Sequence, residues 1–227
     1  VGDASRAGGD SASALAFYQR AQAMRPDWDE PYRRSGETAL ALGMAEEAAA
    51  AYTRLTALAP GDAAALLGLG RALIALDRPA EAADAFTRAQ AAAPKDHRPL
   101  NGLGIARDLA GDHAAAQALY RQGLVLAPDS LSLKNNLGLS LALSGAYAEA
   151  IQVLGDAAKS PGAGPRARQN LALVYGLSGD TDRAAKIGRL DLTEAQVQSN
   201  LKRYEALRKL SDKARARAVH TGQGPDG

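Results

Sequence analysis

Cysteine is absent from the 227 residues, which excludes disulfides, thiol catalysis and cysteine-based metal sites from this sequence. Aromatic residues are scarce at 4%, whereas hydrophobic residues make up 46%, so the apolar content is mostly Ala and Leu. No apolar run approaches the roughly 18 residues of a membrane span. The formal net charge of +2 is too small to indicate a nucleic-acid partner. Because Ala and Leu are strong helix formers, we expect closely packed helices.

The sequence also contains no recognisable catalytic or metal-binding motif. His97, His113 and His220 are its only histidines, and nothing in the sequence places a carboxylate or a second histidine at metal-ligand spacing from them. The signatures G-x-S-x-G and H-E-x-x-H are missing. Two G-L-G triplets, at 68–70 and 102–104, lack the third glycine and the preceding strand of a nucleotide-binding loop. We therefore predict no enzymatic activity, no cofactor and no metal.

What the sequence does have is a period of 34 residues. The segment 128–147, P-D-S-L-S-L-K-N-N-L-G-L-S-L-A-L-S-G-A-Y, overlays earlier segments after one, two and three shifts of 34. A fixed period of this length indicates a repeat array, in which each unit contacts only its neighbours. Four complete units, at 29–62, 63–96, 97–130 and 131–164, follow a partial unit at 1–28 and precede a degenerate one at 165–190.

The same residue types recur at matched positions of the units. A turn residue, a small residue, an alanine and a bulky residue each form a column. The columns are Gly9, Gly43, Asp77, Gly111, Gly145, Gly179; Gly36, Gly70, Gly104, Gly138, Ala172; Ala14, Ala48, Ala82, Ala116, Ala150, Ala184; and Tyr18, Tyr52, Phe86, Tyr120, Leu154, Gly188. Gly at the turn supplies the positive φ that ends a helix. The small columns allow two helices to approach closely, and the bulky column fills the space between helix pairs.

This pattern resembles the tetratricopeptide repeat (TPR) family over roughly residues 10–188. The resemblance implies an all-α, right-handed superhelical solenoid of about five helix pairs, spanning 29–190. Asp29, Asp62 and either Asp129 or Ser130 are expected to cap helices at their N-termini.

The segment after the array carries a separate helix signal. Residues 193–196 have the form of a capping box, and Val197, Leu201 and Tyr204 form an apolar stripe. We predict a C-terminal capping helix over 191–218 and a disordered tail over 219–227. Residues 193–217 hold seven Lys or Arg and three acidic residues. We interpret this basic stretch as a solvated face rather than a lipid-binding or acid-binding one.

The TPR resemblance places the partner-binding groove on the first helix of each pair. The matching positions are Arg33, Glu37, Leu67, Arg71, Ile74, Asn101, Ile105, Asn135, Asn136, Leu139, Gln169, Asn170 and Leu173. Amides both donate and accept hydrogen bonds, so their repetition suits the backbone of an extended peptide. The alternative is that the amides are repeat consensus and the leucines pack on adjacent helices. The Lys and Asn of a chaperone-binding carboxylate clamp are not found together at their groove positions.

The segment 135–208 carries a more specific resemblance. It reads N-N-L-G-L-S-L-A-L-S-G, then S-P-G-A-G-P-R-A-R-Q-N-L-A-L-V-Y-G-L-S-G-D, then D-L-T-E-A-Q-V-Q-S-N-L-K-R-Y-E-A-L-R. This order resembles the TadD family of the bacterial tight-adherence (Flp pilus) system. The resemblance implies a TPR lipoprotein that helps to assemble the outer-membrane secretin, in a pilotin-like role. It also implies a secretin subunit or another pilus-assembly protein as partner, and a periplasmic location with a lipid anchor upstream of Val1.

Two other hypotheses stay open on the sequence. The chain is alternatively a cytosolic TPR adaptor that recruits an unrelated protein, in which case no lipidation motif precedes it. An enzyme would require a catalytic domain outside these residues.

Overall fold

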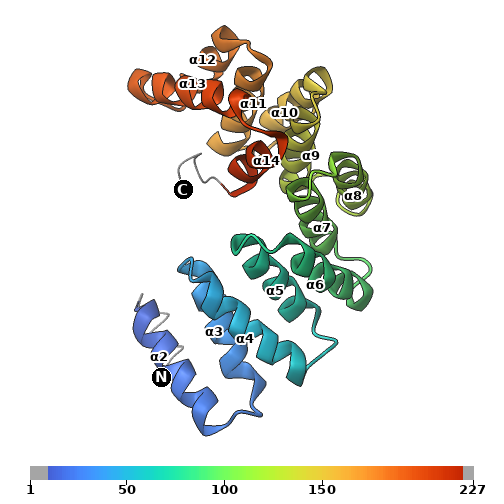
Figure 1. The fold of residues 1–227 in the computed structure, drawn as a ribbon, viewed down its shortest axis with the longest axis vertical. Coiled ribbons are helices and arrows are strands. Elements are labelled where there is room, and N and C mark those ends of the chain that lie inside the picture. The colour runs from blue at the N-terminus through green and yellow to red at the C-terminus, as the bar shows by residue number, and fades with distance from the viewer. Residues whose placement is uncertain (1–9, 222–227) are drawn as a thin grey trace. The chain divides into compact units, whose positions relative to one another are not determined.

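The computed structural model describes residues 10–221, and every regular element within them is a helix (Figure 1). The helices are α2 (Ser11–Met24), α3 (Asp29–Ala41), α4 (Ala45–Leu58), α5 (Ala63–Ala75), α6 (Pro79–Ala92), α7 (Arg98–Leu109), α8 (His113–Leu126), α9 (Leu131–Leu143), α10 (Tyr147–Lys159), α11 (Pro165–Ser178), α12 (Thr181–Gly188), α13 (Glu194–Lys209) and α14 (Asp212–Thr221). The prediction of an all-α fold is confirmed. None of the described helices combines the length and apolarity needed to cross a membrane.

The chain divides into two compact units, Val1–Gly102 and Leu103–Gly227, and the boundary falls inside α7. In unit 1 the successive helices α2 to α6 each pack on the next. In unit 2 the same holds from α8 to α12, with α13 packed on α11 and α12. Helices that follow one another in sequence therefore run antiparallel and side by side, which is the TPR arrangement.

The turns between paired helices depend on a residue with positive φ. Gly43, Gly111, Gly145 and Gly179 have φ values of 74°, 88°, 83° and 92°. Asp77 takes the same place with φ of 56°, a conformation that Asp tolerates better than most residues. The predicted turn column is therefore confirmed from the second turn onward, whereas Gly9 lies outside the described residues.

The alanine column lies in the core. Ala48, Ala82, Ala116 and Ala150 are each 0% exposed, and Ala14 and Ala184 are 0% and 2% exposed. The glycines of the G-L-G triplets lie inside helices and face aromatic rings. A Cβ built at Gly70 or at Gly102 would stand 2.5 Å from the Phe86 ring. These glycines therefore serve close helix packing, as predicted, and do not form a phosphate-binding loop.

Helix starts agree with the sequence in most places. Asp62 accepts a hydrogen bond from the Ala65 amide at 3.0 Å, and Ser130 caps α9 through the Leu133 amide at 3.4 Å. The capping box is present, because the Thr193 amide donates to Gln196 Oε1 at 2.9 Å. Asp29 was wrongly expected to be a cap, since it is the first residue of α3 and Trp28 precedes it at the N-cap.

The C-terminal region contains two helices, α13 and α14, instead of the single capping helix predicted over 191–218. Leu210 has φ −74° and ψ 153°, an extended conformation that ends α13. The Arg215 side chain holds this corner, donating from Nε to the Leu207 carbonyl at 3.0 Å and from Nη2 to the Leu210 carbonyl at 2.8 Å. Residues 219–221 of the predicted tail belong to α14, and 222–227 lie outside the described residues, as do 1–9 of the partial repeat.

Candidate protein-binding surface

The predicted groove residues at the start of unit 1 form a network of ion pairs. Arg33 Nη2 lies 2.7 Å from Oδ2 of Asp62, the N-cap residue of α5, and this ion pair joins α3 to the start of α5. Arg34 Nε lies 2.8 Å from Glu30 Oε1, and Arg34 Nη1 lies 3.4 Å from Glu37 Oε2. Burial raises the pKa of Asp62, but hydrogen bonds from Arg33 and from the α5 backbone outweigh it and leave that pKa lowered. This part of the surface is charged and internally paired.

The other predicted residues of unit 1 differ in exposure. Arg71 on α5 is exposed, and Ile74 on the same helix is half-buried. Leu67 is only 9% exposed, as the packing alternative for the leucines expects. Asn101 on α7 is half-buried. Unit 1 thus offers Arg71 and parts of Ile74 and Asn101 to a partner.

In unit 2 the structure brings predicted amides of neighbouring first helices together. Asn170 Nδ2 on α11 donates to Asn135 Oδ1 on α9 at 3.3 Å. Asn135 is 9% exposed, Asn136 and Asn170 are half-buried, and Gln169 is exposed. Amides of successive repeats therefore form a row, and part of their hydrogen-bonding capacity is used within that row.

The apolar residues predicted beside this row contribute to the core of unit 2. Leu139 is 6% exposed, while Ile105 and Leu173 are half-buried and pack against the same cluster. The surface available to a partner is therefore formed by the polar heads of the amides and by the exposed edges of Ile105 and Leu173.

A buried carboxylate in unit 2 is a feature that the sequence reasoning missed. Asp108 on α7 is fully buried and accepts four hydrogen bonds, from His113 Nδ1 at 2.8 Å, Ser140 Oγ at 2.7 Å, Tyr120 Oη at 3.0 Å and His220 Nε2 at 3.1 Å. The spacing of residues in the sequence therefore did not reveal the carboxylate that lies beside His113 and His220. We call this set the Asp108 cluster.

One signal in the sequence pointed to the Asp108 cluster. Asp108 occupies a first-helix position where the other complete units have Leu40, Ile74 and Ala142, and a histidine follows five residues later. A charged residue in an apolar column needs a buried hydrogen-bonding partner. The contribution of His220 carried no such signal, because it is 112 residues distant in sequence.

The Asp108 cluster holds an ionised carboxylate. Burial raises the pKa of Asp108, but the hydrogen bonds from His113, His220 and Ser140 outweigh burial, so that the pKa is lowered overall. Burial, the Asp108 charge and the hydrogen bond to it raise the pKa of Tyr120 well above its usual value, which keeps the phenol protonated as a donor. Ser140 Oγ donates hydrogen bonds to Asp108 Oδ1 at 2.7 Å and to the His113 carbonyl at 3.4 Å, whereas the serine of a nucleophilic triad donates to a histidine ring nitrogen. Among residues 10–221, no group of three metal-ligating side chains is placed to hold a metal ion.

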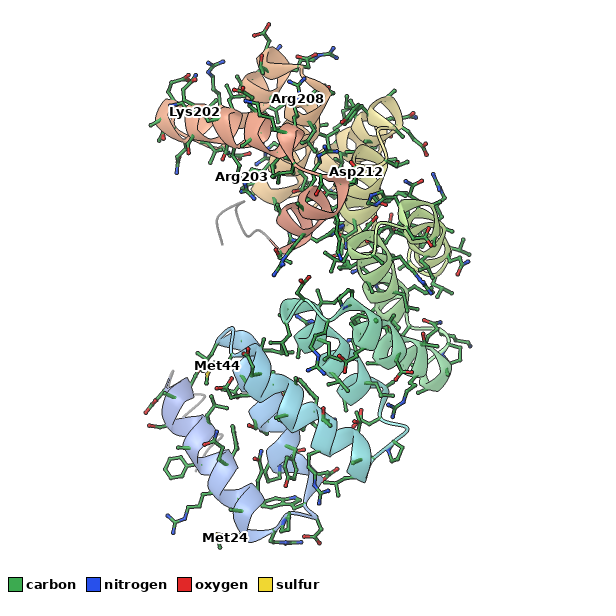
Figure 2. All side chains as sticks on the ribbon, in the orientation of Figure 1. Met24, Met44, Lys202, Arg203, Arg208 and Asp212 are labelled. Carbon is green, nitrogen blue, oxygen red and sulfur yellow. The ribbon has the colours of Figure 1, made fainter. Side chains whose placement is uncertain are left out.

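The basic stretch is partly engaged within the protein. Figure 2 shows Lys202 and Arg203 projecting from α13, and both are exposed. Lys209 Nζ lies 2.8 Å from Glu205 Oε1, and Arg215 caps the end of α13. These contacts agree with a solvated helix face.

Unit 1 has a groove between two of its second helices, α4 and α6. Its volume is about 1000 Å³, and Leu69 and Leu73 of α5 lie along it together with Leu76, the C-cap residue of that helix. Alanines of α4 and α6 also line it, among them Ala49 and Ala85. No sequence pattern predicted this groove, since the small side chains that line it do not form a motif.

Comparison with known proteins agrees with this geometry. The sequence profile of the tetratricopeptide repeat matches residues 33–97 and 102–165, more than half of the chain. No curated protein sequence matches the chain.

Several solved structures are similar to it. A tetratricopeptide repeat protein from Parabacteroides merdae ATCC 43184 is 18% identical with a TM-score of 0.73, over 88% of this chain and 80% of its own. MamA is 25% identical with a TM-score of 0.64, over 69% of this chain and 92% of its own. PilF of Pseudomonas aeruginosa is 19% identical with a TM-score of 0.66, over 87% of this chain and 92% of its own. The likenesses below 25% identity concern the fold alone, and the repeat profile shows that this chain belongs to the tetratricopeptide repeat family.

Proposed function

We propose that this chain is a non-enzymatic protein-binding scaffold that helps to assemble the outer-membrane secretin of a Flp pilus. TPR domains bind proteins and peptides, and the first helices of this chain carry the polar row that such binding uses. The observation that carries this part of the proposal is the amide row of α9 and α11, in which Asn170 reaches Asn135 at 3.3 Å. The half-buried Asn170 amide can exchange this mutual hydrogen bond for hydrogen bonds to a peptide backbone.

The pilus part of the proposal rests on the resemblance of residues 135–208 to the TadD family. The described part of that segment forms α9 to α13, which includes the amide row and the helix that follows the last pair. A pilotin-like protein would bind the secretin subunit in the periplasm and hold it near the outer membrane through its own lipid anchor. The structural similarity to PilF concerns the fold of this chain and does not indicate which partner it binds.

A direct binding measurement tests this proposal. The purified secretin subunit of the same Flp system is titrated against the chain by fluorescence anisotropy. The double variant Asn135→Ala/Asn170→Ala should bind about tenfold more weakly, because two polar contacts are lost and each is worth about 0.5–1.5 kcal/mol. Helix content should be unchanged by circular dichroism.

Matched controls locate the site. Lys202→Ala on the exposed face of α13 should leave the affinity unchanged, and Asn101→Ala reports whether unit 1 takes part. If the secretin binds but the double variant binds as well as the parent, the amide row is not the site. If the secretin does not bind at all, the pilotin role is wrong and the cytosolic adaptor hypothesis is favoured.

The location is tested on the natural full-length protein by fatty-acid labelling and membrane fractionation. Incorporated label and recovery with the outer membrane are the expected results. An unlabelled protein in the cytosolic fraction would contradict the periplasmic assignment.

A further inference from the structure

The last helix of unit 2 covers part of the surface that the TPR resemblance assigns to a partner. Helix α14 packs against α9 (Figure 1). Its buried Ala218 belongs to the same apolar cluster as Leu139 and Ala142 of α9. Both α9 residues occupy first-helix groove positions of their repeat. The chain therefore occupies, with its own helix, a surface that a partner would use.

The apolar surface that α14 buries is small. Of its ten residues, Ala216 and Ala218 are buried, and Val219 is partly buried and packs against the apolar cluster of unit 2. A helix of ten residues is not stable alone in water, so α14 depends on its contacts for its helical state. Two polar side chains supply the main anchors, Arg215 at the α13 corner and His220 at the Asp108 cluster.

The Asp108 cluster is built so that the His220 anchor can leave. Oδ1 of Asp108 accepts from His113 and Ser140, and Oδ2 accepts from Tyr120 at 3.0 Å and from His220 at 3.1 Å. When His220 departs, both carboxylate oxygens keep at least one donor. A buried acceptor that keeps partners escapes the large penalty of an orphaned group. The departure opens one acceptor position on Oδ2, in the place that α14 occupied.

We propose that α14 is a displaceable latch over a protein-binding surface formed by α7 and α9. The partner segment that replaces it is a short helix that presents a small apolar residue to α9, since Ala218 is what α14 itself places in the cluster with Leu139 and Ala142. That segment also presents a hydrogen-bond donor to Asp108 Oδ2 in place of His220. The inference rests on the proposed protein-binding function and specifies the kind of segment that is bound in unit 2.

Hydrogen exchange on the full chain tests whether α14 opens separately. The variant His220→Ala is compared with Lys213→Ala, which changes an exposed residue of the same helix. We expect the α14 amides to exchange at least about tenfold faster in His220→Ala, because a hydrogen bond to a charged group is lost. The amides of α9 and α11 should exchange as in the parent, and Lys213→Ala should have no effect. Unchanged α14 exchange, or an equal rise throughout unit 2, would overturn the latch.

A peptide added in trans tests whether the covered surface accepts a helix. The probe is a fluorescein-labelled peptide of residues 211–221, S-D-K-A-R-A-R-A-V-H-T. It should bind the full-length His220→Ala variant about tenfold more tightly than the parent chain, whose own latch competes for the surface. A peptide with His220→Ala should bind the same variant weakly. If the wild-type peptide binds the variant no better than the parent, the proposal is wrong. Neither experiment uses the secretin, so a failed latch and a failed secretin partnership are distinguished.

Discussion

Units 1 and 2 are built from the same repeat and differ in what fills the spaces between repeats. In unit 2, Gln117 and Arg121 of α8 bridge to the next repeat, with Gln117 Nε2 3.0 Å from Ser144 Oγ and Arg121 Nη2 2.8 Å from Glu149 Oε1. Two periods earlier, at the matching positions of unit 1, stand Ala49 and Thr53, which line the groove between α4 and α6.

The first-helix surfaces differ as well. Unit 1 carries surface ion pairs such as that of Arg33 with Asp62, whereas unit 2 carries amides, a buried carboxylate and the covering helix α14. The alanine and turn columns are common to both units and set the fold. Residues outside those columns therefore decide whether a groove stays open between second helices and whether a further helix covers the first helices.

The largest expected effect comes from overfilling the alanine column. Ala116→Trp places an indole where a 0% exposed methyl group packs, and we expect unit 2 to lose about 3 kcal/mol or more of stability. Ala48→Trp should do the same to unit 1. Hydrogen exchange reports the two units separately, since either substitution adds a second tryptophan to Trp28 and makes fluorescence ambiguous. If either variant melts like the parent, the repeat register is wrong.

Removing the buried carboxylate should destabilise unit 2 by about 3 kcal/mol, because Asp108→Ala leaves several buried donors without their acceptor. The matched change in unit 1 is Asp62→Ala, which removes a helix cap and a partly exposed ion pair and should cost about 1 kcal/mol. Urea denaturation of both variants, with exchange measurements to separate the units, gives the two values. Equal losses would contradict the special role of the Asp108 cluster.

Acid should weaken unit 2 through the same carboxylate. The folded pKa of Asp108 lies below its ordinary value of 3.8, so its contribution is complete above the unfolded pKa. That contribution is lost as the pH falls through the folded pKa, in the range below about 4. The loss should be smaller than that of Asp108→Ala, since a protonated carboxyl still accepts hydrogen bonds. Stability measured from pH 7 to pH 3 should fall less steeply in Asp108→Asn, and parallel curves would contradict this assignment.

The smallest expected effect comes from filling the open groove of unit 1. Thr53→Arg copies Arg121 into unit 1 opposite Glu81, which matches Glu149. An exposed ion pair contributes about 0.5 kcal/mol, so the melting temperature should rise slightly. Thr53→Gln provides a similar length without charge. A rise in Thr53→Gln equal to that in Thr53→Arg would show that packing, and not charge, distinguishes the two units here.

The fold could be predicted from the sequence because it depends on local signals that recur. Each turn needs a residue such as Gly145 that adopts positive φ, and each close contact needs an alanine such as Ala150, so the period alone located the helices. Contacts in such an array join neighbours in sequence, which is why nothing distant was required.

The parts that could not be predicted depend on distant or missing groups. The fourth partner of Asp108 comes from His220 by way of a corner at Leu210, a residue with no turn preference of its own. The α4–α6 groove arises from side chains that are small, and small residues at isolated positions leave no pattern. Asn135 and Asn170 lie on neighbouring first helices and contact each other. The role of this amide row in binding stays a prediction.

The rings of the bulky column also set a spacing. In unit 1 the Phe86 ring lies between Gly70 of its own repeat and Gly102 of the next, with both backbones as close as a missing Cβ allows. The thickness of one side chain per repeat thereby sets the distance from one helix pair to the next. A change at this column alters the distance between successive rows of surface residues without altering any of those residues. Evolution or design can in this way match the rows to the residue repeat of a bound segment while every contact residue stays the same.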